Sequence, residues 1–409
     1  MKSFTTRSLN IPFPKKDPHN ALAMPTYESV AFDFASAEDI AANFRGEFPA
    51  HTYSRTSNPT VEYFETKVKS LTGAHQVLAL ASGMSAISAT IMANCKQGDN
   101  IISGNHLFGH SLALLEQSLS AYGLETRFTD TTKPEQVEAL IDENTRAIYF
   151  ETVTNPQLEI ADISKLAEIA NRHGILLIAD STITPPTVFS SKQFGVHVEV
   201  MSATKFISGG ATAIGGIIID NGLYDWNKNP NCQTFFGKFG KDAFIARLRK
   251  NYYRNLGMPM TAHTANYMIA GLDILELRVE RCYQNCMKLG EFFEQNPKIT
   301  RVDYPGLKNS VYYNLAVSQF GGIPGTVMTF DLESQELCYQ FMNRLKIIRR
   351  ATNLNDNKSL IIHPYSTIYA EFPEGERLKM GIRPTMMRLS VGIEGAEDLI
   401  DDISQALED

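Results

Sequence analysis

The sequence predicts an α/β protein: a mostly parallel seven-stranded sheet, followed by a smaller C-terminal α+β domain. From about residue 60 to residue 220, short apolar runs alternate with helical patterns, which is typical of a sheet that helices cover on both faces. A chain of 409 residues also exceeds what one compact core usually accommodates. In chain order, the predicted strands are Val77–Ala81, Asn100–Ser103, Glu125–Thr129, Arg146–Glu151, Gly174–Ala179, Val198–Ser202 and Ala213–Asp220.

The regions on either side of this sheet differ from it in pattern. Residues 1–50 have four prolines in their first 25 positions, which predicts an extended N-terminal arm that gains order by lying on another surface. Residues 51–250 form the predicted large domain. Residues 251–409 are predicted to contain one long helix from Thr261 to about Gln295 and a small domain with strands Thr326–Asp331, Lys346–Ala351, Ser359–His363 and Met387–Val391 and a closing helix from Glu394.

Charge and cysteine usage exclude several classes of protein. The formal net charge of −7 and the absence of a Lys/Arg run argue against nucleic acid as a partner. No apolar run is long enough to cross a bilayer or to serve as a signal peptide, so a cytoplasmic protein is expected. The five scattered cysteines fit a reducing compartment. Cys282 and Cys286 share a helical face without a nearby histidine, so no metal site is predicted.

Lys205 is the strongest candidate for chemistry, because it lies between an apolar strand and a glycine-rich turn. Asp180 ends a neighbouring apolar run, and ligands of open α/β sheets bind at the carboxyl ends of strands. A lysine that is partly neutral can form a Schiff base with an aldehyde. A buried carboxylate needs a cation, such as a protonated pyridine nitrogen. Together, Lys205 and Asp180 predict that the protein binds pyridoxal phosphate. Taken separately, Lys205 also fits a solvated loop residue, and Asp180 also fits a helix N-cap.

A phosphate site is predicted beside this pair. Ser82, Gly83 and Met84 join a strand to a helix, which leaves free backbone N–H groups at a helix N-terminus. Ser202 and Thr204 are alternate residues before the lysine, so their hydroxyls point the same way in an extended segment. Arg55 either pairs with the phosphate or lies exposed in a capping loop.

Several motifs occur together in this chain. They are Tyr53-Ser54-Arg55 with Asn58-Pro59-Thr60, Ser82-Gly83-Met84, Asn155-Pro156, Asp180 and Ser202-Ala203-Thr204-Lys205. The set resembles the Cys/Met-metabolism PLP-dependent enzymes, which have the aspartate-aminotransferase-like fold (fold type I). Within that family, the O-acetylhomoserine sulfhydrylases are most similar in segments such as Tyr304-Pro305-Gly306-Leu307, Asn355-Asp356-Asn357-Lys358-Ser359 and Arg388-Leu389-Ser390-Val391-Gly392.

The resemblance implies a role for each candidate residue. Lys205, Asp180, Tyr53 and Phe108 would be the catalytic group. Ser82, Gly83, Met84, Ser202 and Thr204 would hold the phosphate, and Tyr53 and Arg55 would reach it from a neighbouring subunit of a homotetramer built as a dimer of dimers. Asn155 would contact the ring hydroxyl and Phe108 would stack on the ring. The substrate carboxylate and side chain would be bound by Arg388, Asn353, Ser359 and His110.

Among the departures from the family pattern, two fall at candidate site residues. At Phe108 the family usually has a tyrosine, whose phenol assists the leaving group at the γ-carbon; phenylalanine stacks but cannot transfer a proton. We therefore expect either a good leaving group such as acetate or proton donation by Tyr53 or a water. His110 stands where sulfhydrylases tend to have glycine and methionine lyases cysteine; it either tunes thiol binding or faces the following helix.

The predicted reaction is γ-replacement on O-acetyl-L-homoserine, or another O-acylhomoserine, with sulfide or methanethiol. Its products would be homocysteine or methionine, plus acetate. A γ-lyase acting on cystathionine or methionine is the nearest alternative, and Asn353 favours replacement because similar lyases tend to have serine there. A protein that binds the cofactor without turnover is a further alternative, supported only by the missing phenol.

Overall fold

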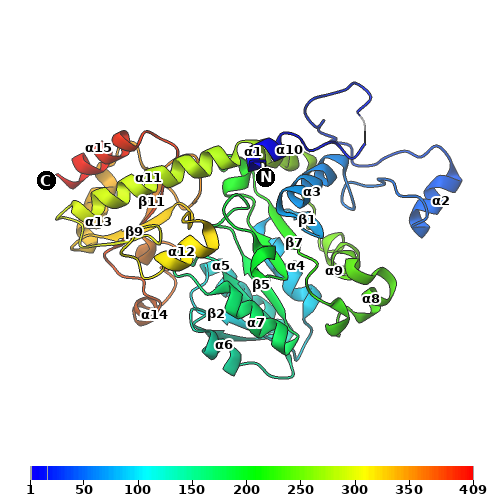
Figure 1. The fold of residues 1–409 in the computed structure, drawn as a ribbon, viewed down its shortest axis with the longest axis horizontal. Helices are drawn as coiled ribbons and strands as arrows, with labels where there is room; N and C mark the ends of the chain where they lie inside the picture. Colours follow the sequence, from blue (N-terminus) through cyan, green and yellow to red (C-terminus); the bar gives the residue numbers. More distant parts are fainter. Residues whose placement is uncertain (1, 16, 409) are drawn as a thin grey trace.

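The structure is a computed structural model that describes residues 2–15 and 17–408. It contains a seven-stranded sheet of order β1-β7-β6-β5-β4-β2-β3 and a five-stranded sheet of order β10-β11-β12-β9-β8 (Figure 1). The strands of the larger sheet are β1 (Gln76–Leu80), β2 (Asn100–Gly104), β3 (Glu125–Thr129), β4 (Thr145–Glu151), β5 (Leu176–Asp180), β6 (Val198–Met201) and β7 (Gly216–Asp220).

Strand pairing in the larger sheet confirms the predicted fold class. The pairs β2–β3, β2–β4, β4–β5 and β5–β6 are parallel, and only β7 runs antiparallel to its neighbours. Because of this alignment, the carboxyl ends of β4, β5 and β6 lie at one edge of the sheet. The segments that carry Glu151, Asp180 and Lys205 follow or end these three strands.

Both faces of the larger sheet are buried at its centre, which explains why its central strands are largely apolar. In β5, Leu176 and Ile178 pack into the core on one face, while Leu177 and Ala179 pack into the core on the other. The flanking helices are α3 (Pro59–Thr72), α4 (Gly83–Asn94), α5 (Gly109–Ala113), α6 (Pro134–Ala139), α7 (Ile163–His173), α8 (Gln233–Phe239) and α9 (Ala243–Arg247).

Helix caps fix where these helices begin and end. The Asp162 side chain accepts a hydrogen bond from Lys165 N at the start of α7, and Gly174 ends the helix in the left-handed conformation. Between these caps, Leu166, Ile169 and Ala170 are buried against the sheet. The chain then enters β5 at Leu176, so α7 delivers the strand that ends at the site.

The smaller sheet differs in detail from the prediction. Its strands are β8 (Arg301–Asp303), β9 (Val327–Asp331), β10 (Arg349–Arg350), β11 (Leu360–Ile362) and β12 (Met386–Ser390). Strand β8 was not predicted, and the strand expected at Lys346–Ala351 is only two residues long because Asp402 accepts hydrogen bonds from the backbone N–H groups of residues 346–348. Its helices are α12 (Tyr313–Phe320), α13 (Gln335–Arg344), α14 (Glu374–Lys379) and α15 (Ala396–Leu407).

The single helix expected from Thr261 to Gln295 is two helices, α10 (Ala262–Asp273) and α11 (Leu275–Gln295), separated at Ile274. The start of α11 is tied to the segment after Lys205. The Arg278 guanidinium donates to the carbonyl oxygens of Phe206 and Gly271. The Arg278 side chain thereby links the segment after Lys205 to helix α10.

The N-terminal arm is less extended than predicted, because it contains α1 (Phe4–Ser8) and α2 (Ala37–Arg45). Helix α1 docks on the body, where Thr5 N donates to Glu276 at 2.8 Å and Phe4 is buried. Helix α2 has no buried residue and stands away from the body in Figure 1. The part of the arm around α2 therefore lacks a partner surface within this chain. Within the described ranges, no helix is long and apolar enough to span a membrane.

Gly271 sets how closely α10 approaches the segment after Lys205. A Cβ atom there would lie 1.9 Å from the Ile207 carbonyl oxygen. We expect Gly271→Ala to lower the free energy of unfolding by about 1–3 kcal/mol, the usual cost of overpacking, and to weaken cofactor retention. Thermal unfolding and cofactor absorbance measure both effects.

Gly237→Ala is the matched control, because a Cβ at Gly237 in α8 would meet no atom within 4 Å. This variant should be neutral or slightly stabilised, since alanine favours a helix over glycine. Equal behaviour of the two variants would contradict the importance of the contact between Gly271 and Ile207.

Candidate active site

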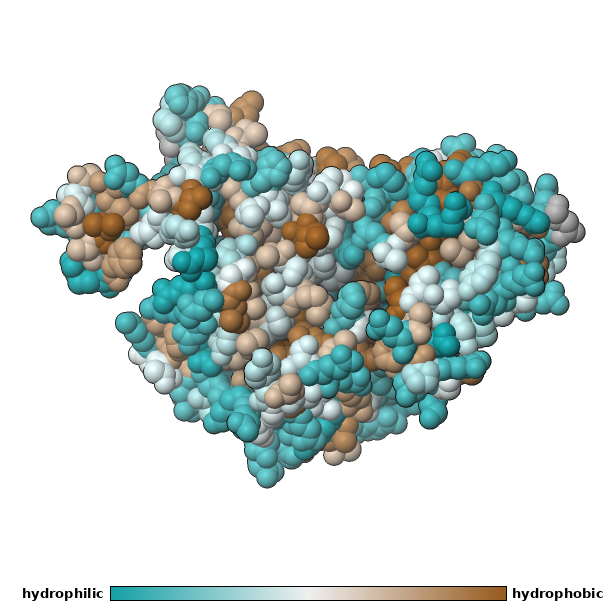
Figure 2. All heavy atoms as spheres, turned by 180° about the vertical axis from the view of Figure 1, so that it is seen from behind, coloured by the Kyte–Doolittle hydropathy of each residue, from teal (hydrophilic) through white to brown (hydrophobic). Residues whose placement is uncertain are grey.

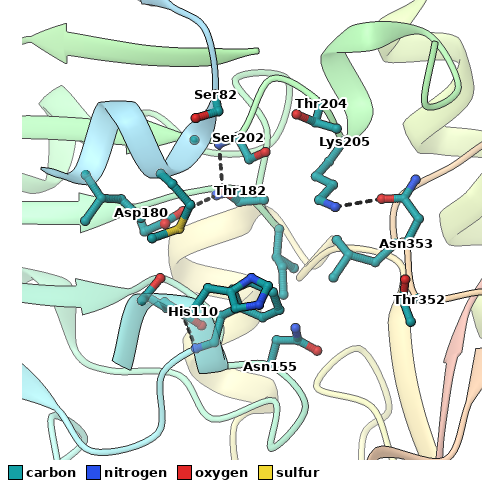
Figure 3. Close-up of a pocket in the computed structure, with 18 of the residues that line it drawn as sticks. Ser82, His110, Asn155, Asp180, Thr182, Ser202, Thr204, Lys205, Thr352 and Asn353 are labelled. Carbon is teal, nitrogen blue, oxygen red and sulfur yellow. Dashed lines mark hydrogen bonds between the residues drawn. The ribbon is translucent and has the colours of Figure 1, made fainter. Parts of the chain in front are cut away.

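A cavity of about 470 Å³ lies at the carboxyl edge of the larger sheet. Figure 3 shows side chains from several elements pointing into it, with Ser82, Ser202 and Thr204 on one side and His110 and Asn155 on another. The lining residues are Ser82, Gly83, Met84, Ile87, Phe108, His110, Ser111, Glu151, Val153, Asn155, Asp180, Thr182, Ile183, Ser202, Thr204, Lys205, Ile214, Thr352, Asn353, Leu354 and Ile368. Many of them are the residues that the sequence predicted.

Lys205 follows β6 and precedes a short 3₁₀ turn, Phe206–Ser208. Its Nζ donates to Asn353 Oδ1 at 2.6 Å, so the amine is held in the cavity (Figure 3). Burial and, to a smaller extent, the nearby Arg388 cation lower the pKa of Lys205 to about 8. A lysine with this pKa is partly neutral near neutral pH, as attack on an aldehyde requires.

Asp180 ends β5 beside the cavity and is 9% exposed. Its carboxylate accepts hydrogen bonds from Thr182 N at 2.9 Å and from the Tyr149 hydroxyl at 3.3 Å. Burial raises the pKa of Asp180. In the described part of the chain, no cation pairs with its carboxylate to oppose this effect. A protonated pyridine nitrogen would supply the missing positive charge.

The phosphate end is built from α4 and the segment before Lys205. Ser82 caps α4, and its Oγ accepts a hydrogen bond from Ser85 N at 3.1 Å. A Cβ at Gly83 would lie 2.7 Å from Ser202 Cβ, so only glycine lets the helix N-terminus approach this closely. Helix N-termini favour anions, so this cradle fits a phosphate. Thr204 Oγ1 lies beside it, accepting from Gly215 N at 3.1 Å.

Arg388 lies behind the cavity on β12 and is 2% exposed. It donates to Asn155 Oδ1 at 3.0 Å and to the carbonyl oxygens of Thr352 and Asn353 at 3.1 Å. Its Nε has no hydrogen-bond partner among the described residues. Burial lowers the pKa of Arg388 to about 10. An unpaired buried donor on a guanidinium suits a substrate carboxylate.

Phe108 and His110 form one wall of the cavity at the start of α5. Phe108 N donates to Glu151 Oε1 at 2.7 Å, which fixes the turn that carries the ring. The two rings meet edge to face with centroids 5.1 Å apart. His110 therefore lines the cavity and contacts Phe108, so it does not simply face the helix that follows.

Four predicted site residues do not line the cavity: Arg388, which lies behind it, and Ser359, Tyr53 and Arg55. Ser359 is fully buried, and its hydroxyl donates to Glu394 Oε2 at 2.9 Å and accepts from Gly392 N at 2.9 Å, so it is not free to bind substrate directly. Arg55 donates to the Arg254 carbonyl oxygen and lies over the Tyr53 ring. Neither Tyr53 nor Arg55 lines the cavity of its own chain.

Sequence reasoning missed Glu151 and Thr182, which line the cavity beside Asp180. Glu151 was predicted only as the last residue of a strand. Because β4 and β5 are parallel neighbours, its position opposite Asp180 follows from the same argument that identified Asp180. No sequence pattern indicates Thr182. Its Oγ1 accepts a hydrogen bond from Ser202 N, which is 20 residues further along the chain.

The fold and the site define a pyridoxal-phosphate-dependent enzyme of fold type I. The chain belongs to the family described as Cys/Met metabolism PLP-dependent enzymes, whose model matches residues 5–408. The predicted family and cofactor are therefore confirmed.

Three known proteins illustrate the similarity. The chain is 34% identical to L-methionine gamma-lyase of Pseudomonas putida, over 100% of this chain and 98% of the relative. It is 43% identical to the solved O-acetylhomoserine sulfhydrylase of Wolinella succinogenes, covering 87% of this chain and 99% of that one with a TM-score of 0.78. A Campylobacter jejuni structure with N'-pyridoxyl-lysine-5'-monophosphate at its position 205 is 31% identical, covers 100% of both chains and has a TM-score of 0.96.

The low pKa of Lys205 can be tested without turnover. We expect trace acetylation of the apoprotein at Lys205, followed by mass spectrometry, to rise through a midpoint near pH 8. Arg388→Met should move this midpoint to higher pH, because it removes a nearby positive charge that disfavours the protonated amine. Exposed Lys165 reports reagent activity within the same sample. A midpoint that Arg388→Met leaves unchanged would contradict this electrostatic account.

Proposed function

We propose that this enzyme catalyses γ-replacement on O-acetyl-L-homoserine, with sulfide or methanethiol as the nucleophile. The observation that carries the proposal is the hydrogen bond from Lys205 to Asn353. Asn353 is the residue that favours replacement over elimination, and the structure brings it into contact with the lysine. The similarity to the Wolinella succinogenes sulfhydrylase, at 43% identity, supports the same reading.

The residues of this chain suit the required proton transfers. When bound, pyridoxal phosphate supplies an electron sink for the α-carbon of an amino acid. Asp180 would hold the proton on the ring nitrogen, which would keep that sink effective. Lys205 would take the α-proton of the bound amino acid, because its lowered pKa makes it a base near neutral pH. Arg388 binds the substrate carboxylate through its unpaired Nε.

The wall around the γ-carbon suits an ester better than a thioether. Phe108 offers no proton to a leaving group, and acetate leaves as a stable anion without one. Apolar side chains also line the cavity, including Val153, Ile183 and Ile368. Such a wall limits water near the reacting carbon and accepts a small sulfur nucleophile. His110 is the polar group on this side, and we place it beside the incoming thiol.

We further propose that the sites are shared across a dimer, with two dimers forming a tetramer. Tyr53 and Arg55 lie outside the cavity of their own chain, and the nearby arm leaves Leu22 and Phe44 exposed. Figure 2 shows the arm projecting from the body with apolar side chains on it. A second subunit would cover these side chains and receive Tyr53 and Arg55 at its phosphate site.

A γ-lyase is the second candidate, because the methionine gamma-lyase of Pseudomonas putida matches the whole chain. A cofactor-binding protein without turnover is disfavoured, since Lys205, Asp180 and Arg388 lie together at one site.

Product analysis distinguishes replacement from elimination. With O-acetylhomoserine and sulfide, we expect homocysteine to exceed 2-oxobutyrate by at least about tenfold, because the apolar wall and Asn353 favour addition of the thiol. A panel with methanethiol, O-succinylhomoserine, cystathionine and methionine identifies the donor and the acceptor. Release of 2-oxobutyrate that does not depend on sulfide would favour the lyase.

Phe108→Tyr tests the consequence of the missing phenol. We expect it to speed elimination from methionine or cystathionine by about tenfold or more, because a positioned acid typically contributes 10²–10⁴-fold, while acetate release from O-acetylhomoserine changes little. Phe108→Leu, which also lacks the phenol, is the control for ring stacking. Equal rates for Phe108→Tyr and wild type with every substrate would remove the basis for this account.

A further inference from the structure

Glu151 and Asp180 are two buried carboxyl groups at adjacent strand ends. Strands β4 and β5 are parallel, and Glu151 is the register partner of Asp180. The two residues are 8% and 9% exposed, and both line the cavity. Two carboxylates placed this closely in a buried site oppose each other's ionisation.

Among the described residues around this pair, no cation balances the charge of the two carboxyl groups. The titratable groups that face Glu151 are Asp180 on β5, Tyr149 on β4 and Tyr369 in the segment after β11. Burial raises the pKa of both phenols, so they remain neutral. Lys205 bonds to Asn353, and Arg388 bonds to Asn155 and to backbone carbonyl oxygens. Within residues 2–15 and 17–408, neither carboxyl forms an ion pair.

The cofactor ring brings one positive charge, which balances one carboxylate. Asp180 is the better anion, because its oxygens accept hydrogen bonds from both Thr182 N and the Tyr149 hydroxyl. Burial and the neighbouring Asp180 raise the pKa of Glu151 well above its ordinary range. When Glu151 keeps its proton, the pair carries one negative charge, which equals the one positive charge of the cofactor ring.

Glu151 also fixes the turn that carries Phe108, which lines the cavity beside it. Its carboxyl accepts a hydrogen bond from Phe108 N at 2.7 Å. Phe108 is the N-cap residue of α5. The carboxyl group of Glu151 therefore holds the backbone at the start of this helix and the aromatic ring that projects from it.

We propose that Glu151 is a positioning residue that remains protonated in the working enzyme, leaving Asp180 as the single negative charge that faces the cofactor ring. The neutral carboxyl keeps an acceptor oxygen for Phe108 N without adding a second buried charge. This inference rests on the cofactor of the family and not on the proposed sulfur substrate.

Infrared difference spectroscopy of the holoenzyme tests the protonation state directly. The spectrum of wild type minus Glu151→Gln should contain the carbonyl stretch of a protonated carboxyl group at pH 8. Glu199→Gln is the matched control, because Glu199 is also buried but lies outside the cavity. Burial raises the pKa of Glu199 to about 7, so it is mostly ionised at pH 8. Absence of a Glu151-dependent carboxyl band would overturn the proposal.

Cofactor affinity tests the positioning role. We expect Glu151→Gln to stay within about threefold of wild type, because it is neutral and keeps a carbonyl acceptor. Glu151→Ala should weaken binding about thirtyfold or more, since the buried N–H of Phe108 loses its acceptor and the turn that carries its ring is released. Asp180→Asn should weaken binding more than Glu151→Gln does. If Glu151→Gln is as weak as Glu151→Ala, or weaker than Asp180→Asn, the proposal fails. If Glu151→Ala does not fold, the Gln and Asn variants and the infrared spectrum still decide.

Discussion

The parallel alignment of β4, β5 and β6 is the constraint on which the site depends. Parallel neighbours end at the same edge of a sheet, so the residues at their carboxyl ends meet although they are far apart in sequence. Here that alignment places Glu151 opposite Asp180 and sets the segment of Lys205 beside them. In β5 the residues before the end of the strand are all apolar, so Asp180 is its first polar side chain.

Electrostatic balance in the cavity follows from burial more than from pairing. Burial lowers the pKa of Lys205 and Arg388 and raises the pKa of Glu151 and Asp180. Within the described residues, the protein thus holds a lysine that is partly neutral and a carboxylate that forms no ion pair. These are the two conditions that an aldehyde cofactor with a basic ring nitrogen satisfies.

Contacts behind the cavity hold its walls in place. Arg278 binds the carbonyl oxygen of Phe206, one residue after Lys205, and Gly271 lets α10 approach Ile207. On the other side, Arg388 joins Asn155 to the segment that carries Asn353. The lysine is therefore positioned by helices α10 and α11 and by residues in and beside the smaller sheet, so substitutions outside the cavity are expected to influence cofactor retention.

The sequence by itself determined the mostly parallel sheet, the cofactor and the central pair Lys205 and Asp180, because apolar strands followed by polar residues are local patterns. It did not determine that Ile274 separates two helices, that Ser359 is engaged by Glu394 and Gly392, or that Glu151 lies beside Asp180. These features depend on which segments meet in three dimensions, and hydrogen bonds between distant segments leave no periodic signal in the chain. Only the tertiary structure, by bringing strand ends and loops together, decided which side chains face the cavity and which are already occupied.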